Sequence, residues 1–299
     1  MYVVTGATGN TGHVVANRLL DQKRKVRAIG RSRNRLEPLA ARGAEVIVAD
    51  LNDQNALIKA FSGADAVYLM IPPNEKSQDP LADQRGTASS LTGALKQAQI
   101  KYAVQLSSIG ADKESGTGPV AGLHEFEAML DELPGLNVVH LRPGYFMENT
   151  LGEVAAVVKM GHMVGLLRSD LKMPIIATKD IGNRAADLLL DLNFNGKHTQ
   201  ELLGHSDLTM TEVAKTIGQS IGKPDLHYKQ LPPEQVKPVL EQMGMSPAVA
   251  DLIVEMSAAL NTGHMRALEQ RSARNTTPTS YESFTQEVLL PLYRQEQAA

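Results

Sequence analysis

Cysteine and tryptophan are both absent from this 299-residue sequence, and aromatic residues of all kinds make up only 4% of it. Without cysteine there can be no disulfide, thiolate zinc site, iron–sulfur cluster or cysteine nucleophile, and a reducing compartment is expected. The formal net charge is −3, whereas proteins that bind nucleic acid through its phosphates are usually basic. We therefore expect no direct nucleic-acid partner.

Long hydrophobic runs are missing as well. The most apolar stretch, residues 154–167, is interrupted by Lys159 and His162, so it is a poor candidate for a membrane span. The first residues are typical of a strand, without the basic flank and apolar core of a signal peptide. We expect a cytoplasmic protein with no membrane partner.

What the sequence does contain is a regular alternation over its first 142 residues. Strands are expected at 2–5, 25–30, 44–49, 65–71, 102–107 and 137–142, and helices at 11–22, 34–42, 53–61 and 79–97. The strands are almost continuously apolar, which indicates that helices cover both faces of a parallel sheet. This pattern predicts an α/β fold of the Rossmann type, a doubly wound parallel sheet.

After Pro143 the elements become shorter. The sequence predicts a strand at 173–177 and helices that begin at the capping residues Thr209 and Ser246. We therefore divide the chain into a sheet domain at 1–149 and a smaller, mostly helical C-terminal lobe at 150–299, with a helix at 180–192 that packs back on the sheet.

Three glycines spaced three apart, Gly6, Gly9 and Gly12, lie between the first strand and the first helix. At a strand-to-helix turn this spacing is typical of a dinucleotide site. Gly6 permits a tight turn, Gly9 lets a diphosphate approach the backbone, and Gly12 lets the helix pack close to the strand. Side-chain donors are also available from Thr8, Asn10 and Thr11. A plain flexible turn is the alternative.

The second strand ends in "GRSRNR", with no acid where NAD-specific sites place an Asp or Glu for the ribose hydroxyl. Arginine binds phosphate bidentately, whereas a carboxylate would repel the 2′-phosphate of NADP. We therefore expect NADP(H) as the cofactor, with Arg31 on the 2′-phosphate. The alternative is that Arg31, Arg33 and Arg35 simply begin a solvated helix.

Three further residues are candidates for the cofactor site. Asp50 follows the third strand, where it would meet the adenine amino group; a surface turn is the alternative. Met70 and Ile71 end the fourth strand and would flank the ribose and nicotinamide, unless they are ordinary core.

Taken together, these segments resemble the NmrA-like branch of the atypical short-chain dehydrogenases, which includes NAD(P)H-dependent quinone and azo-compound reductases. The resemblance covers nearly the whole chain and rests on "VTGATGNTG", "VRAIGRS", "GAEVIVADLND", "GADAVYLMIPP", "LSSIGA", "HEFEAML", "LRPGYFMEN", "ATKDIGNRAADLL" and "GHSDLTMTEVAKTIGQSIGK". It implies a Rossmann domain that binds NADP(H), and a substrate-binding lobe that closes a cleft over the nicotinamide.

The proton-donating Tyr-x-x-x-Lys pair of ordinary short-chain dehydrogenases is absent, because no tyrosine here is followed four residues later by lysine. Reducing a simple ketone makes an alkoxide that needs a positioned acid. Reducing a quinone makes a phenolate-like anion, which needs less help because a phenol has a pKa of roughly 10. The sequence therefore favours hydride transfer to a quinone- or azo-like acceptor.

Candidate catalytic and substrate-binding residues follow the fifth and sixth strands. Ser107 or its neighbour Ser108 would bond to substrate or ribose, and His124 would donate a proton or orient the substrate. Tyr145 and Phe146, with Met147, would form a flat wall for an aromatic ring, with Asn149 as a polar contact and Tyr145 also a catalytic candidate. Turn formation and core packing are the structural alternatives for these residues.

Two other functions stay open at this point. One is a non-catalytic NADP(H) redox sensor that regulates a partner protein, as in some members of the family. The other is reduction of a carbon–carbon double bond, although related enzymes use a lysine near the position of Leu123. The histidines show no ligand spacing, so no metal is expected. The partner would be a small-molecule electron acceptor, and a homo-oligomer is an open alternative.

Overall fold

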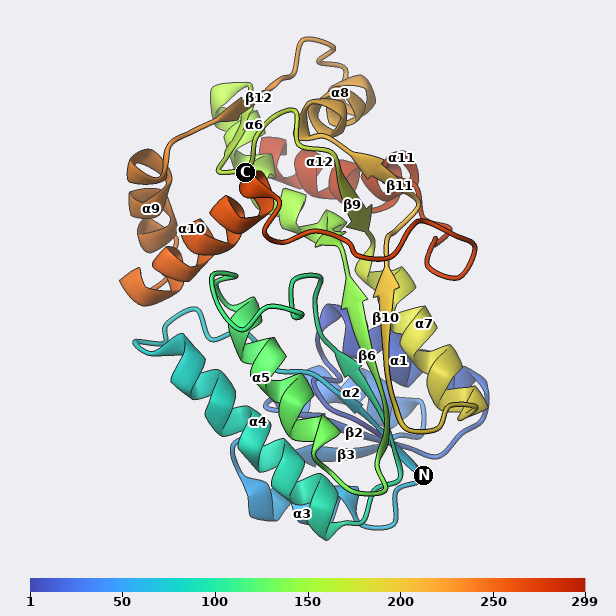
Figure 1. Cartoon of the computed structure of the whole chain (residues 1–299). Coiled ribbons are helices and arrows are strands. Elements are labelled where there is room, and N and C mark those ends of the chain that lie inside the picture. The colour runs from blue at the N-terminus through green and yellow to red at the C-terminus, as the bar shows by residue number, and fades with distance from the viewer. Residues whose placement is uncertain (299) are drawn as a thin grey trace.

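The computed structural model describes residues 1–298, which form one large parallel sheet and a smaller lobe (Figure 1). Seven strands pair in the order β10-β6-β5-β4-β1-β2-β3, and every pair is parallel. Their bounds are β1 (Tyr2–Val4), β2 (Val26–Gly30), β3 (Glu45–Val48), β4 (Ala66–Leu69), β5 (Tyr102–Leu106), β6 (Asn137–Pro143) and β10 (Lys197–Leu202). This order is that of a Rossmann sheet, so the expected fold class is confirmed.

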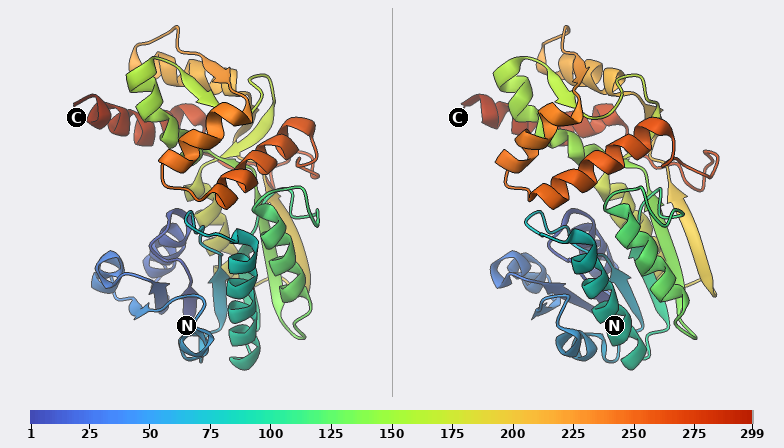
Figure 2. Two further views of the ribbon diagram at one scale, coloured as in Figure 1. Left: turned by 90° about the vertical axis from the view of Figure 1, so that its left-hand side faces the viewer. Right: turned by 60° about the vertical axis from the view of Figure 1, so that its left-hand side comes forward.

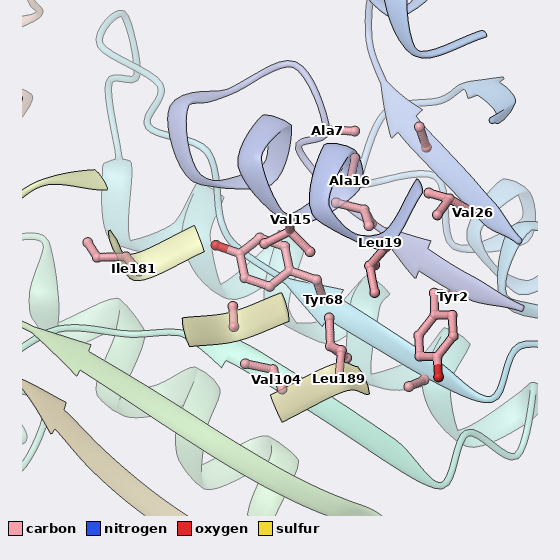
Figure 3. Packing of buried hydrophobic residues seen from close by; sticks show 14 of the residues in the cluster. Tyr2, Ala7, Val15, Ala16, Leu19, Val26, Tyr68, Val104, Ile181 and Leu189 are labelled. Atoms are coloured by element: carbon pink, nitrogen blue, oxygen red, sulfur yellow. The ribbon is translucent and has the colours of Figure 1, made fainter. Parts of the chain in front are cut away.

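Helices cover both faces of this sheet. They are α1 (Asn10–Asp21), α2 (Arg33–Ala41), α3 (Gln54–Phe61), α4 (Pro80–Gln97), α5 (Val120–Asp131) and α7 (Thr178–Asp191). One apolar core lies under α1, α2 and α7, and a second lies under α3, α4 and α5. Figure 3 shows the first core, where Tyr68 and Val104 of the sheet meet Val15 of α1 and Ile181 of α7.

Several helices begin at capping residues that the sequence shows. Asp53 and Asp79 each accept a backbone N–H bond at the start of α3 and α4. Strand β4 is shorter than the predicted 65–71, because the Met70 amide donates to the Thr5 side chain (3.2 Å) instead of to a neighbouring strand. Met70 and Ile71 therefore lie in the connection that follows the strand.

The smaller lobe caps the carboxyl edge of the sheet (Figure 2). Its helices are α6 (Val154–Met160), α8 (Met210–Ile221), α9 (Pro233–Gln242), α10 (Pro247–Thr262), α11 (Tyr281–Phe284) and α12 (Leu290–Ala298), with a 3₁₀ helix at Met147–Glu153 and a π-helical turn at Thr285–Leu289. Two small sheets add β7 (Tyr145–Phe146), β9 (Met173–Ile176) and β11 (Ser206–Leu208), and β8 (Met163–Gly165) with β12 (Tyr228–Gln230). The capping box of Thr209 and Glu212 and the Ser246 cap both form as the sequence predicts.

After the first excursion into the lobe, the chain returns to the sheet. Helix α7 packs against α1, and β10, which the sequence analysis does not identify, pairs with β6 at the sheet edge. Residues 178–202 therefore belong by packing to the sheet, while the boundary at residue 149 stays a prediction. Within residues 1–298, no helix has both the length and the apolarity needed to cross a bilayer.

The contact between α7 and α1 depends on Gly182. A Cβ at this position would lie 2.6 Å from the Val14 Cβ and 2.8 Å from the Thr11 carbonyl oxygen. Overpacking of this kind typically costs about 1–3 kcal/mol. We expect Gly182→Ala to lower the melting temperature by roughly 2 °C or more in a chain of this size.

The matched control is Gly152→Ala, because nothing lies within 4 Å of a Cβ at Gly152. Differential scanning calorimetry of both variants makes the comparison. Equal melting temperatures would contradict the account of close helix packing.

Candidate dinucleotide and substrate site

The glycine loop after β1 is shaped by close backbone approaches. Gly6 has φ +59°, and a Cβ there would lie 2.6 Å from the Met70 sulfur. A Cβ on Gly12 would overlap the Gly6 carbonyl oxygen and come 2.8 Å from its carbon. Among residues 1–298, apart from the chain neighbours of Gly9, only the Gly6 carbonyl oxygen lies within 4 Å of a Cβ at Gly9, at 3.3 Å. The outer side of Gly9 is thus open to a ligand.

Helix α1 begins directly on this loop with Gly9 as its N-cap. No side chain caps the helix and no acid lies in its first turn. The first backbone N–H groups of a helix lack intrahelical partners and carry the positive end of its dipole. Such an end is suited to bind the oxygens of a phosphate or diphosphate.

The loop side chains differ in what they offer. Asn10 is exposed at the helix start, while Thr11 is buried and its hydroxyl accepts a bond from Tyr68 (2.8 Å). Burial raises the pKa of Tyr68, so this phenol stays a donor to Thr11. The Thr8 carbonyl accepts a bond from Arg35 Nη2 at 2.8 Å. Arg35 is exposed, as the solvated alternative expects, but its side chain also reaches back to the loop, a contact that the sequence does not predict.

Arg31 lies at the carboxyl end of β2 and is exposed. Within residues 1–298 it forms no ion pair, whereas Arg33 lies 3.9 Å from Glu37 on the same helix. Its neighbour Gly30 lies against Thr8 of the glycine loop, so the unpaired charge of Arg31 follows directly after that contact. That environment suits a second phosphate group.

Asp50 and Ile71 have local structural partners. Asp50 is exposed, and its Oδ1 accepts the Asn52 amide bond at 2.8 Å, which forms a turn before α3. Ile71 is half-buried against the core under α3, α4 and α5. A role for either residue toward a cofactor stays a prediction.

Ser107 belongs to a buried network at the carboxyl ends of β5 and β6. Its hydroxyl donates to Glu127 Oε1 at 2.5 Å, and Arg142 Nε donates to the same oxygen at 2.9 Å. Burial acts to lower the pKa of Arg142, but the bond and charge of Glu127, with the charges of Asp112 and Glu201, hold it above its ordinary value. The Ser107 hydroxyl is thus engaged with Glu127, and Ser108 Oγ donates to the Ile109 carbonyl (2.9 Å).

His124 lies on the first turns of α5 and is half-buried. Its Nδ1 is 2.9 Å from the Ala111 carbonyl oxygen. Because a carbonyl only accepts, Nδ1 carries the hydrogen, and Nε2 is the nitrogen left for another partner. A role of His124 toward a substrate stays a prediction.

Tyr145 and Phe146 form the short strand β7 between the two halves of the molecule. Phe146 packs against the sheet core and Tyr145 against the lobe core, as the alternation of a strand requires. Burial, reinforced by the negative charge of Glu153, raises the pKa of Tyr145, although its bond with Asn149 opposes the shift. Tyr145 therefore stays a neutral donor, and Asn149 lies exposed next to it.

The sequence does not predict the position of Glu153. It sits among apolar residues of the lobe, and its Oε2 accepts the Val164 amide bond at 3.1 Å. Burial raises its pKa. Tyr228 belongs to the same group, since Glu153 and Tyr145 both contribute to raising its pKa after burial. The local sequence does not show that the Glu153 carboxyl points into the lobe.

Most of these candidates follow the carboxyl ends of sheet strands, at the edge that faces the lobe (Figure 1). Ligands of doubly wound sheets bind at that edge. Within residues 1–298, no three histidine or acidic side chains gather into a potential metal site.

This combination of a parallel βαβ unit, an uncapped helix start and a glycine loop defines a dinucleotide-binding Rossmann protein. The model of the NmrA-like family matches residues 2–285, and the chain belongs to that family.

Two curated relatives are similar over most of their length. An NAD(P)H azoreductase of Xenophilus azovorans is 28% identical over 258 residues, 86% of each chain. Quinone oxidoreductase 2 of Escherichia coli (strain K12) is 28% identical over 268 residues, 88% of this chain and 89% of that one. The crystal structure of the Escherichia coli quinone oxidoreductase complexed with NADPH has a TM-score of 0.81, at 26% identity, and covers 97% of this chain and 100% of its own.

The buried carboxyl of Glu153 leads to a prediction about pH. A carboxyl whose pKa is raised on folding favours the folded state at low pH, and this contribution is lost as the pH rises through its folded-state pKa. Glu153→Gln replaces the carboxyl with a neutral amide, so the variant does not lose this stability as the pH rises. We expect its melting temperature, relative to the unmodified chain, to increase between about pH 4 and pH 7.

Thermal melts across this pH range test the expectation, with Glu132→Gln on the exposed surface as the control for removal of one charge. A difference between Glu153→Gln and the unmodified chain that does not change with pH would show that the Glu153 carboxyl is not desolvated.

Proposed function

We propose that this protein is an NADPH-dependent reductase of quinone- or azo-like acceptors. The observation that carries the proposal is the uncapped start of α1 on an open glycine loop, next to the uncompensated Arg31. The names of the two relatives, a quinone oxidoreductase and an NAD(P)H azoreductase, support the choice of acceptor.

The residues present fit this cofactor. The amides of Asn10 to Gly12 would hold the diphosphate, and Arg31 would hold the 2′-phosphate of the adenosine ribose. The open side of Gly9 leaves room for a diphosphate at the backbone. When bound, NADPH supplies the hydride.

The rest of the reaction requires no strong acid from the protein. The Ser107 hydroxyl is engaged with Glu127, and Tyr145 is held neutral by burial. A quinone product leaves as a phenolate-like anion that takes its proton from water. His124 would orient that water by accepting its hydrogen bond at Nε2. Tyr145 and Asn149 would orient the acceptor, so positioning rather than acid catalysis would supply most of the rate.

A cytoplasmic location, a homo-oligomer and a regulatory protein partner remain predictions from the sequence. Of these, the partner protein belongs to the alternative function, a redox sensor. Catalytic turnover separates the two functions.

Oxidation of NADPH in the presence of a panel of quinones and azo dyes tests the proposal directly. We expect turnover with at least one conjugated acceptor and none with simple ketones, because no Tyr-x-x-x-Lys pair is present. If NADPH binds but no acceptor is reduced, the reductase proposal fails and the sensor becomes the better account.

The coenzyme preference gives a second test. Arg31→Ala should weaken NADPH binding by about tenfold or more, since a charge-assisted bond to phosphate is lost. NADH, which has no 2′-phosphate, should bind with unchanged affinity.

Titration calorimetry with both coenzymes measures the ratio of the NADPH and NADH affinities. Arg33→Gln, two residues away, serves as the control. An Arg31→Ala variant whose NADPH to NADH ratio equals that of the control would remove Arg31 from the site.

A further inference from the structure

A cavity of about 320 Å³ lies at the outer edge of the sheet beside β10. Its apolar lining is formed by Val139 of β6, Leu188 of α7 and Phe194 of the loop before β10. Arg184, His198 and Arg274 line it as well, and among residues 1–298 no carboxylate does. None of these residues belongs to the candidate dinucleotide site.

Arg184 is unusual among the arginines of the chain. The other half-buried arginines each pair with a carboxylate: Arg18 with Asp187, Arg27 with Glu45, and Arg142 with Glu127. Arg184 is half-buried too, yet within residues 1–298 it forms no ion pair. A partly desolvated charge without a counterion is costly, and an anionic ligand would relieve that cost.

The guanidinium of Arg184 is held in a fixed position. Gln200 is only 2% exposed, and its Oε1 accepts bonds from Arg184 Nε (3.1 Å) and Nη2 (2.9 Å). Its Nε2 donates to the Arg274 carbonyl at 2.9 Å. One buried amide thus fixes the Arg184 guanidinium and the backbone of Arg274 at the cavity wall. Within residues 1–298, Arg184 Nη1 has no hydrogen-bond partner.

The lining also indicates what kind of anion would fit. The Phe194 ring is fixed by an edge-on contact with Tyr102, with 5.4 Å between the ring centres, and Val139 is buried beside the same cavity. Apolar walls with a few placed polar groups are typical of sites for small organic molecules. A volume of about 320 Å³ suits a single ring and its substituent.

We propose that this cavity binds a small organic carboxylate with an apolar, ring-sized body. The carboxylate would lie against Arg184, with Arg274 as the second positive charge, and the ring would pack on Leu188 and Phe194. This cavity is separate from the candidate dinucleotide site, so the proposal does not depend on the proposed reductase function.

Fluorine NMR with fluorobenzoate tests the proposal, with fluorobenzyl alcohol as the neutral probe and inorganic phosphate as the competitor. We expect fluorobenzoate to bind the full chain, with or without saturating NADPH, and the alcohol to bind much more weakly. Phosphate should displace fluorobenzoate poorly, because it gains nothing from the apolar wall.

Arg184→Gln should weaken fluorobenzoate binding by about tenfold or more. Arg274→Gln is the second variant, since its side chain makes no bond within residues 1–298 and its loss should not disturb folding. Arg24→Gln, an exposed arginine elsewhere, is the control. Thermal melts confirm that each variant is folded.

The proposal is overturned if fluorobenzoate does not bind, if Arg184→Gln and Arg274→Gln bind it as well as the control does, or if phosphate displaces it at equal concentration. It is also overturned if sedimentation shows that the Arg184 and Arg274 variants dissociate an oligomer, because the cavity would then be an interface between copies.

Discussion

The close approach of α1 to β1 is the contact on which the rest of the site depends. It requires Gly12, because any side chain there would overlap the carbonyl of Gly6. The same approach brings the uncapped end of α1 onto the loop, and Gly182 then allows α7 to pack on the other side of that helix. The packing of α1 on the sheet and the positive potential at the loop therefore both depend on this close approach.

A second buried network lies at the carboxyl ends of β5 and β6. Glu127 joins α5 to β5 and β6 through Ser107 and Arg142, and it does so in the core, where such a pair is sensitive to the loss of either partner. A role of Ser107 toward a substrate or the ribose stays a prediction. Arg31 and Asp50 follow β2 and β3 at the edge that faces the lobe, whereas the part of this edge after β6 carries the neutral groups Tyr145 and Asn149. Within residues 1–298, Nε2 of His124 forms no hydrogen bond. This composition suits an acceptor whose reduced form needs no strong acid.

The sequence predicted the sheet, its helices and the glycine loop, because apolar periodicity and capping residues act locally. It did not predict β10, which has few apolar residues and is a strand only because β6 provides its hydrogen bonds. Nor could it show that Glu153 turns into the lobe, that Arg35 bonds to the loop, or that Ser107 is engaged by Glu127. Each of these depends on a residue distant in sequence, and local patterns carry no information about such partners.

The most direct test of the central claim is a crystal structure of the chain grown with NADPH. The account predicts the diphosphate within hydrogen-bond distance of the backbone amides of Asn10, Thr11 and Gly12, with the 2′-phosphate against Arg31. A diphosphate bound elsewhere, or a 2′-phosphate directed away from Arg31, would contradict it.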